Sequence, residues 1–317
     1  MHTYSFHITD RQRNVIEQEY GHRVADPWLK NLPETVSNLC TQWNLTPTGV
    51  PDSGSMSACV YVSDTENNHY VLKLPVHPEV SQPEVAALDA WDKQKLAPHI
   101  QRYDQETGAL LLNRIQPGTP AEPGTGYTDI DTLARVIHTM IQTPLPLTSI
   151  PTYRGRVNMR HTWARNRFQQ TNNTAGLHLL DKSDALLHTL TTRGTSNKLL
   201  HGDLQPKNIL LDHDSSWKLI DPLPCVGDPE YDIALWTVSQ THGRRIIDIV
   251  QHLVISAPFI REQLLIDWVT VMCVLELRPT DAQRNHRQQD FLHTVTAAYV
   301  LREQHAGKLA DEALNTR

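Results

Sequence analysis

The sequence has few of the residues that build disulfide frameworks or transition-metal centres. Its 317 residues include only four cysteines, Cys40, Cys59, Cys225 and Cys273, which lie far apart and form no CxxC pair. This spacing favours reduced, buried thiols over disulfides or a zinc site. The seventeen histidines are scattered and form no HExxH pattern. The composition therefore predicts no transition metal.

Long apolar runs and an excess of basic residues are missing as well. No stretch approaches the roughly 18 apolar residues of a membrane span. Residues 1–10 contain no basic segment followed by an apolar run. We therefore expect a cytoplasmic protein that does not associate with membranes. The formal net charge is -6, with acids and bases mixed along the chain, so we also expect no nucleic-acid partner.

The first third of the chain predicts one helix followed by a small antiparallel sheet. Apolar residues recur at helical intervals between Leu29 and Leu39, which indicates an amphipathic helix near residues 26–43. Short runs of β-forming residues follow at 58–62, 70–74, 100–103 and 109–112. A further helix is expected after Pro83. We predict a first lobe over residues 1–113 with a sheet of about five strands.

The rest of the chain, residues 114–317, is predicted to form a mostly helical second lobe. The segment from Gln116 to Gly126 contains three prolines and three glycines, which favours irregular backbone and places a hinge just before it. Helices are expected near residues 128–142, 158–191, 230–240, 243–256, 259–277 and 287–304. Short apolar pairs between Leu199 and Ile220 indicate strands that hold a loop. The predicted fold class is α+β, in two lobes.

The strongest motif lies in that loop. Residues 201–208 read HGDLQPKN, and Asp221 follows Asn208 by thirteen positions. Phosphoryl transfer uses one carboxylate to accept the proton of the acceptor hydroxyl, and oxygen ligands to hold Mg²⁺ against the phosphates. We therefore predict Asp203 as the catalytic base, and Asn208 and Asp221 as the Mg²⁺ ligands. A chance tripeptide whose aspartate caps a helix is the alternative.

Two segments of the sequence, HGDLQPKNILL at 201–211 and IDPLPCVGDPEYDIALW at 220–236, resemble the aminoglycoside phosphotransferase superfamily. The likeness is greatest to its streptomycin 6-kinase and hydroxyurea phosphotransferase branch. It implies a protein-kinase-like fold with a small antiparallel-sheet N-lobe that binds nucleotide and a helical C-lobe that carries the acceptor site. It also implies ATP as the phosphoryl donor, with GTP as an alternative, Mg²⁺ as the metal, and a small-molecule hydroxyl acceptor.

The resemblance also assigns a phosphate-binding lysine. Lys73 matches the family lysine that contacts the nucleotide phosphates and pairs with a helix glutamate. Such an ion pair keeps the long side chain aimed at the phosphates. We expect Glu84 to be the partner, with Glu79 as the competing candidate. Without the motif at 201–208, a single strand lysine would be interpreted as a solvated edge residue.

Further nucleotide contacts are expected on both sides of Lys73. Gly54, Ser55 and Ser57 lie where the family has a phosphate-covering turn, although an ordinary hairpin turn explains them equally well. Asn113 and Ile115 lie in the passage from strand to hinge, where the family's backbone contacts adenine. We include all five residues in the predicted cofactor site.

Four residues are expected to support the catalytic loop or bind the acceptor. Asp232 resembles the family aspartate that accepts backbone N–H bonds from the loop, and His201 belongs to the same support. Asp232 as a helix cap is the alternative. Asp228 and Glu230 are candidates for binding hydroxyl or cationic groups of the acceptor, because carboxylates pair with both. Solvated surface acids are the alternative.

The spacing of the motifs also bears on the substrate. Only eleven positions separate Asp221 from Asp232, which leaves no room for the activation segment that aligns a peptide in a protein kinase. The family loop often reads HGDLHxGN, whereas this chain has Gln205 and Lys207 at two of those positions. We expect O-phosphorylation of an aminoglycoside-like antibiotic or a related amino sugar. The alternatives are a metabolic kinase for a sugar or amino alcohol, and an inactive nucleotide-binding regulatory module. The oligomeric state stays open.

Overall fold

The computed structural model describes residues 8–51, 56–121, 130–240, 246–276 and 284–315. The chain divides into two compact units. The first comprises Met1–Gly118 and Asp212–Asp221, and the second comprises Thr119–Leu211 and Pro222–Arg317. Within the described residues, no helix combines the length and the apolar character needed to cross a bilayer.

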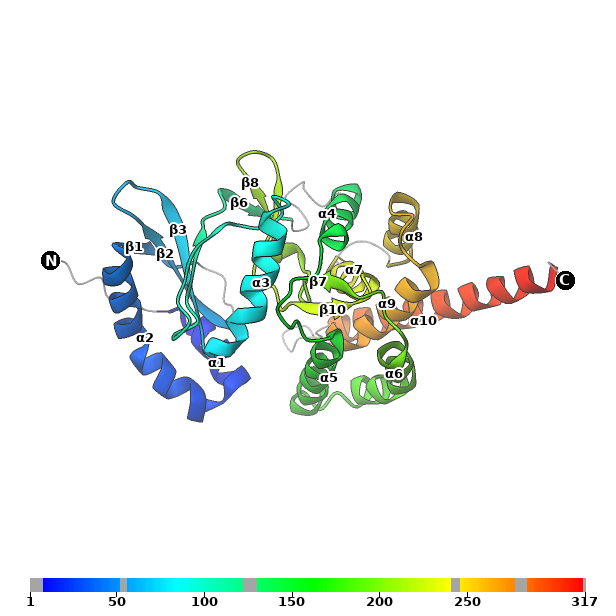
Figure 1. The fold of residues 1–317 in the computed structure, drawn as a ribbon. Helices are drawn as coiled ribbons and strands as arrows, with labels where there is room; N and C mark the ends of the chain where they lie inside the picture. Colours follow the sequence, from blue (N-terminus) through cyan, green and yellow to red (C-terminus); the bar gives the residue numbers. More distant parts are fainter. Residues whose placement is uncertain (1–7, 52–55, 122–129, 241–245, 277–283, 316–317) are drawn as a thin grey trace. The chain divides into compact units, whose positions relative to one another are not determined.

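The first unit is built on a five-stranded antiparallel sheet with the order β1-β2-β3-β5-β4. The strands are β1 (Thr46–Gly49), β2 (Ser57–Ser63), β3 (His69–Pro75), β4 (Ile100–Tyr103) and β5 (Leu110–Asn113). Figure 1 shows α2 (His22–Trp43) and α3 (Ser81–Asp92) on opposite sides of this sheet. The predicted strands and the predicted helix after Pro83 are thus confirmed, and β1 supplies the fifth strand.

The face of the sheet that packs against α2 forms the core of this unit. Leu32, Val36 and Leu39 of α2 pack with buried side chains of β2 and β3, such as Val60 and Leu72. Because successive strand residues point to opposite faces, Lys73 next to Leu72 points away from α2. The helix therefore closes one face of the sheet and leaves Lys73 on the other.

A first helix, α1 (Asp10–Tyr20), was not expected from the sequence. Thr9 and Gln12 form a capping box at its start, in which Thr9 Oγ1 accepts a bond from Gln12 N and Gln12 Oε1 accepts one from Thr9 N. The spacing T-x-x-Q is a signal from which this start could have been found. Gly21, at a φ of 72°, separates α1 from α2, so α2 begins four residues before the predicted start.

The second unit is mostly helical, as predicted. Its helices are α4 (Ile130–Gln142), α5 (Tyr153–Gln170), α6 (Thr174–Thr192), α7 (Glu230–Ser239), α8 (Ile246–Ser256), α9 (Glu262–Glu276) and α10 (Arg284–Asn315). The predicted single helix over 158–191 is wrong, because the chain turns between α5 and α6, which pack side by side (Figure 1). At this turn Asn172 has a φ of 51°, and the Asn173 side chain caps α6 by accepting a bond of 2.8 Å from Gly176 N.

Short strands frame the loop that carries the strongest motif. β7 (Lys198–Leu200) pairs antiparallel with β10 (Cys225–Gly227). β6 (Pro117–Pro120), β8 (Ile209–Asp212) and β9 (Trp217–Leu219) form a three-stranded sheet with the order β6-β8-β9. The strands predicted between Leu199 and Ile220 are confirmed. Irregular backbone was expected over residues 116–126, but Pro117–Pro120 form β6. Residues 122–126 lie outside the described part of the chain.

The division into units differs from the predicted boundary after Asn113. Residues 212–221 belong to the first unit, although the sequence placed them in the helical lobe. Two bonds account for this: Leu219 N donates to Leu96 O at 2.7 Å, and Lys218 Nζ donates to Lys95 O at 2.7 Å. Both acceptors are backbone carbonyls that follow α3, so one backbone and one side-chain donor tie the chain segment that ends in Asp221 to the first unit.

Candidate active site

The loop that follows β7 turns at a glycine that no other residue could replace without strain. Gly202 has a φ of 76°, and a Cβ added to it would lie 1.9 Å from Leu223 O. Leu223 N in turn donates to His201 O at 2.9 Å. The segment after Asp221 therefore packs directly on the backbone of the loop, and the missing side chain of Gly202 permits this approach.

A buried carboxylate on α7 holds the start of this loop. Asp232 accepts bonds from two successive backbone N–H groups, His201 N at 2.6 Å and Gly202 N at 2.9 Å. Burial raises the pKa of Asp232 to about 7, and the two backbone bonds act in the opposite direction. The His201 ring adds a contact, since its Nδ1 accepts a bond of 3.3 Å from Asp203 N. The structure thus contains the bracing contact that the sequence suggested for Asp232.

Asp203 follows immediately, and both of its carboxylate oxygens have donors. Oδ1 accepts bonds from Arg160 Nη2 at 2.8 Å and Gln205 Nε2 at 2.7 Å, whereas Oδ2 accepts one from Asn208 Nδ2 at 3.1 Å. Burial by itself would raise the pKa of Asp203, but the charges of Arg160 and Lys207 outweigh it and lower the pKa to about 2. Asp203 is therefore ionised at neutral pH, as a general base must be.

Arg160 and Gln205 are site residues that the sequence prediction missed. Arg160 lies on α5, which carries five arginines and no acidic residue, so nothing in the local sequence distinguishes it from the other four. Its contact with Asp203 joins positions 43 residues apart. Gln205 was noted only as a departure from the family pattern. The proximity of its amide to Asp203 is a consequence of the loop geometry.

Asn208 lies in the 3₁₀ turn Pro206–Asn208 between the loop and β8. Its Nδ2 donates to Asp203 O at 2.8 Å and to Asp203 Oδ2. Because these bonds use the amide nitrogen, Oδ1 is the atom that Asn208 would offer to a cation. The amide nitrogen of Asn208 thus bonds the predicted base, Asp203, and its amide oxygen is the predicted metal ligand.

The first unit holds a second cluster of charged groups, centred on Lys73. Lys73 Nζ lies 2.6 Å from Glu84 Oε1 and 2.6 Å from Asp221 Oδ1. Burial would lower the pKa of Lys73, but Asp221 and Glu84 outweigh it, so the net pKa is raised and the ammonium stays charged. Burial also raises the pKa of Glu84, against the effect of Lys73. Glu79, the competing candidate, has an exposed side chain and lies 3.9 Å from His77 instead.

The structure describes three of the five remaining predicted nucleotide contacts, Ser57, Asn113 and Ile115. Gly54 and Ser55 lie outside the described residues. Ser57 begins β2 opposite Pro75 and is buried. Asn113 ends β5, where its N donates to His99 O at 3.0 Å and its Oδ1 accepts a bond from Gln101 Nε2. Ile115 is half-buried between β5 and β6. These positions stay predictions.

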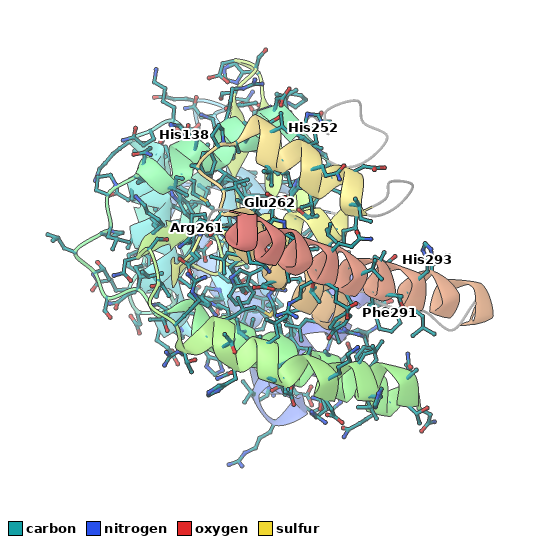
Figure 2. The ribbon with its side chains drawn as sticks, turned by 90° about the vertical axis from the view of Figure 1, so that its right-hand side faces the viewer. His138, His252, Arg261, Glu262, Phe291 and His293 are labelled. Carbon is teal, nitrogen blue, oxygen red and sulfur yellow. The ribbon has the colours of Figure 1, made fainter. Side chains whose placement is uncertain are left out.

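Asp228 and Glu230, the predicted acceptor-binding acids, have buried carboxylates that are bound by Arg261. Arg261 Nη2 lies 2.6 Å from Asp228 Oδ1 and 2.7 Å from Glu230 Oε2, and Arg261 N and Nε donate to Glu230 Oε1. Asp228 also accepts a bond from Ser196 N. Figure 2 shows Arg261 beside Glu262, the first residue of α9. The two acids therefore fix the start of α9.

Comparison with known proteins matches this chain to a family of small-molecule kinases. A family model described as aminoglycoside/hydroxyurea antibiotic resistance kinase matches residues 42–275. The chain is 28% identical over 227 residues to a hydroxyurea phosphotransferase of Kitasatospora aureofaciens, covering 69% of this chain and 64% of that protein. It is 26% identical over 231 residues to a streptomycin 6-kinase of Streptomyces griseus, covering 71% and 72%.

Solved structures share the fold at low sequence identity. The choline kinase LicA from Streptococcus pneumoniae has a TM-score of 0.59 at 16% identity, covering 84% of this chain and 99% of that one. LicA in complex with AMP gives a TM-score of 0.60 at 16% identity, covering 85% and 98%. An aminoglycoside phosphotransferase from Alicyclobacillus acidocaldarius gives 0.55 at 14% identity, covering 84% and 93%. The fold is therefore the two-lobed, kinase-like one, with an antiparallel-sheet lobe and a helical lobe.

Proposed function

Because the chain belongs to the aminoglycoside/hydroxyurea antibiotic resistance kinase family, we propose that it transfers the γ-phosphoryl group of ATP to a hydroxyl of a small molecule. The observation that carries the proposal is the setting of Asp203. Its carboxylate is ionised and oriented by three side-chain donors from two elements and its own loop. A module that only bound nucleotide would have no use for such a group, which argues against the inactive alternative.

Asp203 would act as the general base of the transfer. Its Oδ1 is engaged by both Arg160 and Gln205, whereas Oδ2 has the single contact with Asn208. Oδ2 is therefore the oxygen that we assign to the proton of the acceptor hydroxyl. A positioned base of this kind contributes roughly 10²–10⁴-fold to rate.

The donor set fits a hard divalent cation. Asn208 supplies an amide oxygen and Asp221 a carboxylate, and such oxygens are the ligands that Mg²⁺ prefers. We propose that these two residues hold Mg²⁺, which when bound would offset the charge of the nucleotide phosphates. Lys73 would contact the phosphates directly, and Glu84, 2.6 Å away, would keep the ammonium in place. GTP as the donor is an alternative that the same residues would accept.

For the acceptor, we propose an aminoglycoside-like antibiotic of the streptomycin type or a related amino sugar. Support comes from the relative named streptomycin 6-kinase. The relative named hydroxyurea phosphotransferase makes hydroxyurea the second acceptor to test. Asp228 and Glu230 add little support for a cationic acceptor, because both carboxylates are buried and already paired with Arg261. A metabolic kinase for a sugar or amino alcohol stays the alternative, because the likeness to the choline kinase LicA, at 16% identity, shows the fold alone.

The proposal is tested by measuring ADP release from Mg–ATP in the presence of streptomycin-type and deoxystreptamine aminoglycosides, hydroxyurea, glucosamine and simple sugars. Turnover that depends on one acceptor and is absent from Asp203→Ala would establish the activity and its substrate class. Mg–ATP binding without turnover on any acceptor would contradict the proposed substrate class. Equal turnover in the variant would remove Asp203 from its role.

A further inference from the structure

Arg160 is a buried cation whose guanidinium makes four hydrogen bonds beside the catalytic loop. Its side chain is 2% exposed, and each of its three nitrogens is engaged. Nε donates to Tyr231 Oη at 3.1 Å, Nη1 to Glu276 Oε1 at 2.6 Å, and Nη2 to both Gly202 O at 2.9 Å and Asp203 Oδ1 at 2.8 Å. One guanidinium of α5 thus joins the loop, α7 and the last residue of α9.

The geometry of a guanidinium makes this arrangement rigid. The group is planar, carries five N–H donors in a fixed fork and stays charged, so its bonds fix direction as well as distance. Nη2 bonds the carbonyl of Gly202 and the carboxylate of Asp203 together. The Asp203 side chain is therefore held relative to its own backbone. A lysine ammonium, as a point charge, would not impose the same orientation.

The charges of the cluster explain why Glu276 belongs to it. A buried cation is costly unless it is paired and hydrogen-bonded. Burial would lower the pKa of Arg160, but Glu276, Tyr231 and Asp203 outweigh it and keep the cation charged. Glu276 engages Nη1, whereas Nη2 bonds Gly202 and Asp203 of the loop. Glu276 thereby holds the guanidinium through a nitrogen that the loop does not use.

We propose that Arg160 is a positioning residue for phosphoryl transfer: it holds Asp203 Oδ1 so that Oδ2 faces the acceptor hydroxyl, and Glu276 anchors Arg160 in that orientation. The inference rests on the proposed function, and it adds the residues on α5 and α9 that make the base usable. Neither residue is expected to touch the nucleotide. Their loss should therefore act on the transfer step and leave nucleotide binding unchanged.

The first test is steady-state kinetics of Arg160→Lys with the acceptor that the wild-type protein uses. A small displacement of a reacting group lowers rate by about 10²-fold, so we expect kcat to fall by about that factor. The Kd for Mg–ATP and the KM for acceptor should stay within about twofold, since neither ground-state contact changes. Glu276→Gln should lower kcat in the same direction by about tenfold. Wild-type kcat in Arg160→Lys would overturn the proposal.

Arg167→Lys is the matched control. Arg167 lies two turns further along α5 and donates Nη2 to Leu275 O at 2.6 Å, next to Glu276, without contacting Asp203. Its kcat should stay within about twofold of wild type. An equal loss of kcat in both lysine variants would assign the effect to the packing of α5 against α9 and would overturn the positioning role.

A crystal structure makes the test independent of turnover. In Arg160→Lys, or in Glu276→Gln if the lysine variant does not fold, the Asp203 carboxylate should rotate away from its wild-type orientation. An unchanged carboxylate would overturn the proposal. Failure of the proposed function would appear separately, as wild-type protein that binds Mg–ATP and turns over none of the acceptors.

Discussion

Lys73 Nζ lies 2.6 Å from Oδ1 of Asp221, a residue 148 positions further along the chain. The same ammonium lies 2.6 Å from Glu84. A strand, the helix that follows it and the segment after β9 therefore meet in one charged cluster of the first unit. Asp221 reaches it at a φ of 54°, a left-handed conformation that is costly for a non-glycine residue and is often found at functional sites.

Replacing Glu84 by glutamine should weaken nucleotide binding. The neutral amide keeps the shape of the side chain but no longer draws the ammonium to the α3 side, so Lys73 is left with Asp221 as its charged partner. We expect the Kd for Mg–ATP, measured by calorimetry, to rise about tenfold, which corresponds to about 1.4 kcal/mol. Glu79→Gln is the control, because the Glu79 side chain is 76% exposed. Equal effects of the two substitutions would argue against the Lys73–Glu84 pair.

Substitutions of Asp203 and Asp221 should have different effects, the first on the transfer step and the second on metal-dependent nucleotide binding. Asp203→Asn removes the base and should lower kcat by roughly 10²–10⁴-fold while Mg–ATP still binds. Asp221→Asn should instead raise the Mg²⁺ concentration needed for half-maximal nucleotide binding, since an amide is a weaker ligand than a carboxylate. Titrating Mg²⁺ at fixed ATP distinguishes the two variants. An unchanged Mg²⁺ requirement in Asp221→Asn would remove that residue from the metal site.

Glu230→Gln should affect stability and leave acceptor binding unchanged. Its carboxylate is buried and bonded to three nitrogens of Arg261, so the neutral amide loses charge-assisted bonds. We expect the free energy of unfolding, from urea titration, to fall by about 1–3 kcal/mol. Glu262→Gln, at a side chain that is 44% exposed, should change it by less than about 0.5 kcal/mol. A raised acceptor KM in Glu230→Gln would instead support the predicted acceptor-binding role of this residue.

Gly202→Ala should be among the most damaging small substitutions in the catalytic loop. Its φ of 76° disfavours a side chain, and the added Cβ would meet Leu223 O at 1.9 Å. We expect a loss of stability of about 3 kcal/mol or more, together with loss of turnover, because the backbone next to Asp203 must move. Gly194→Ala, whose Cβ would have no neighbour within 4 Å, is the matched control. Its urea midpoint and kcat should stay near wild type.

Much of the architecture could be predicted from local sequence. The period of the apolar residues in α2, the β-forming runs of β2 and β3, and the motif at 201–208 each depend on residues close together in the chain. Hydrophobic periodicity reports such elements directly, because burial of one face repeats along the chain. The break between α5 and α6 was missed, although the polar run Thr-Asn-Asn-Thr at 171–174 is a loop signal from which it could have been found.

The candidate site was predictable only as far as its motifs extend. The chemistry of phosphoryl transfer explains the residue types at Lys73, Asp203, Asn208 and Asp221. The sequence by itself therefore determined these four as candidates. The surroundings of each carboxylate were decided by the tertiary structure. Asp203 and Asp228 are both aspartates that follow a glycine, yet the fold places one against Arg160 and Asn208 and the other against Arg261. The pairings with Arg160 and Arg261 join residues 43 and 33 positions apart, and only tertiary packing brings them together. Whether a carboxylate is available for chemistry depends on which side chains lie next to it in space. The linear sequence does not give the distances between residues that are far apart in the chain.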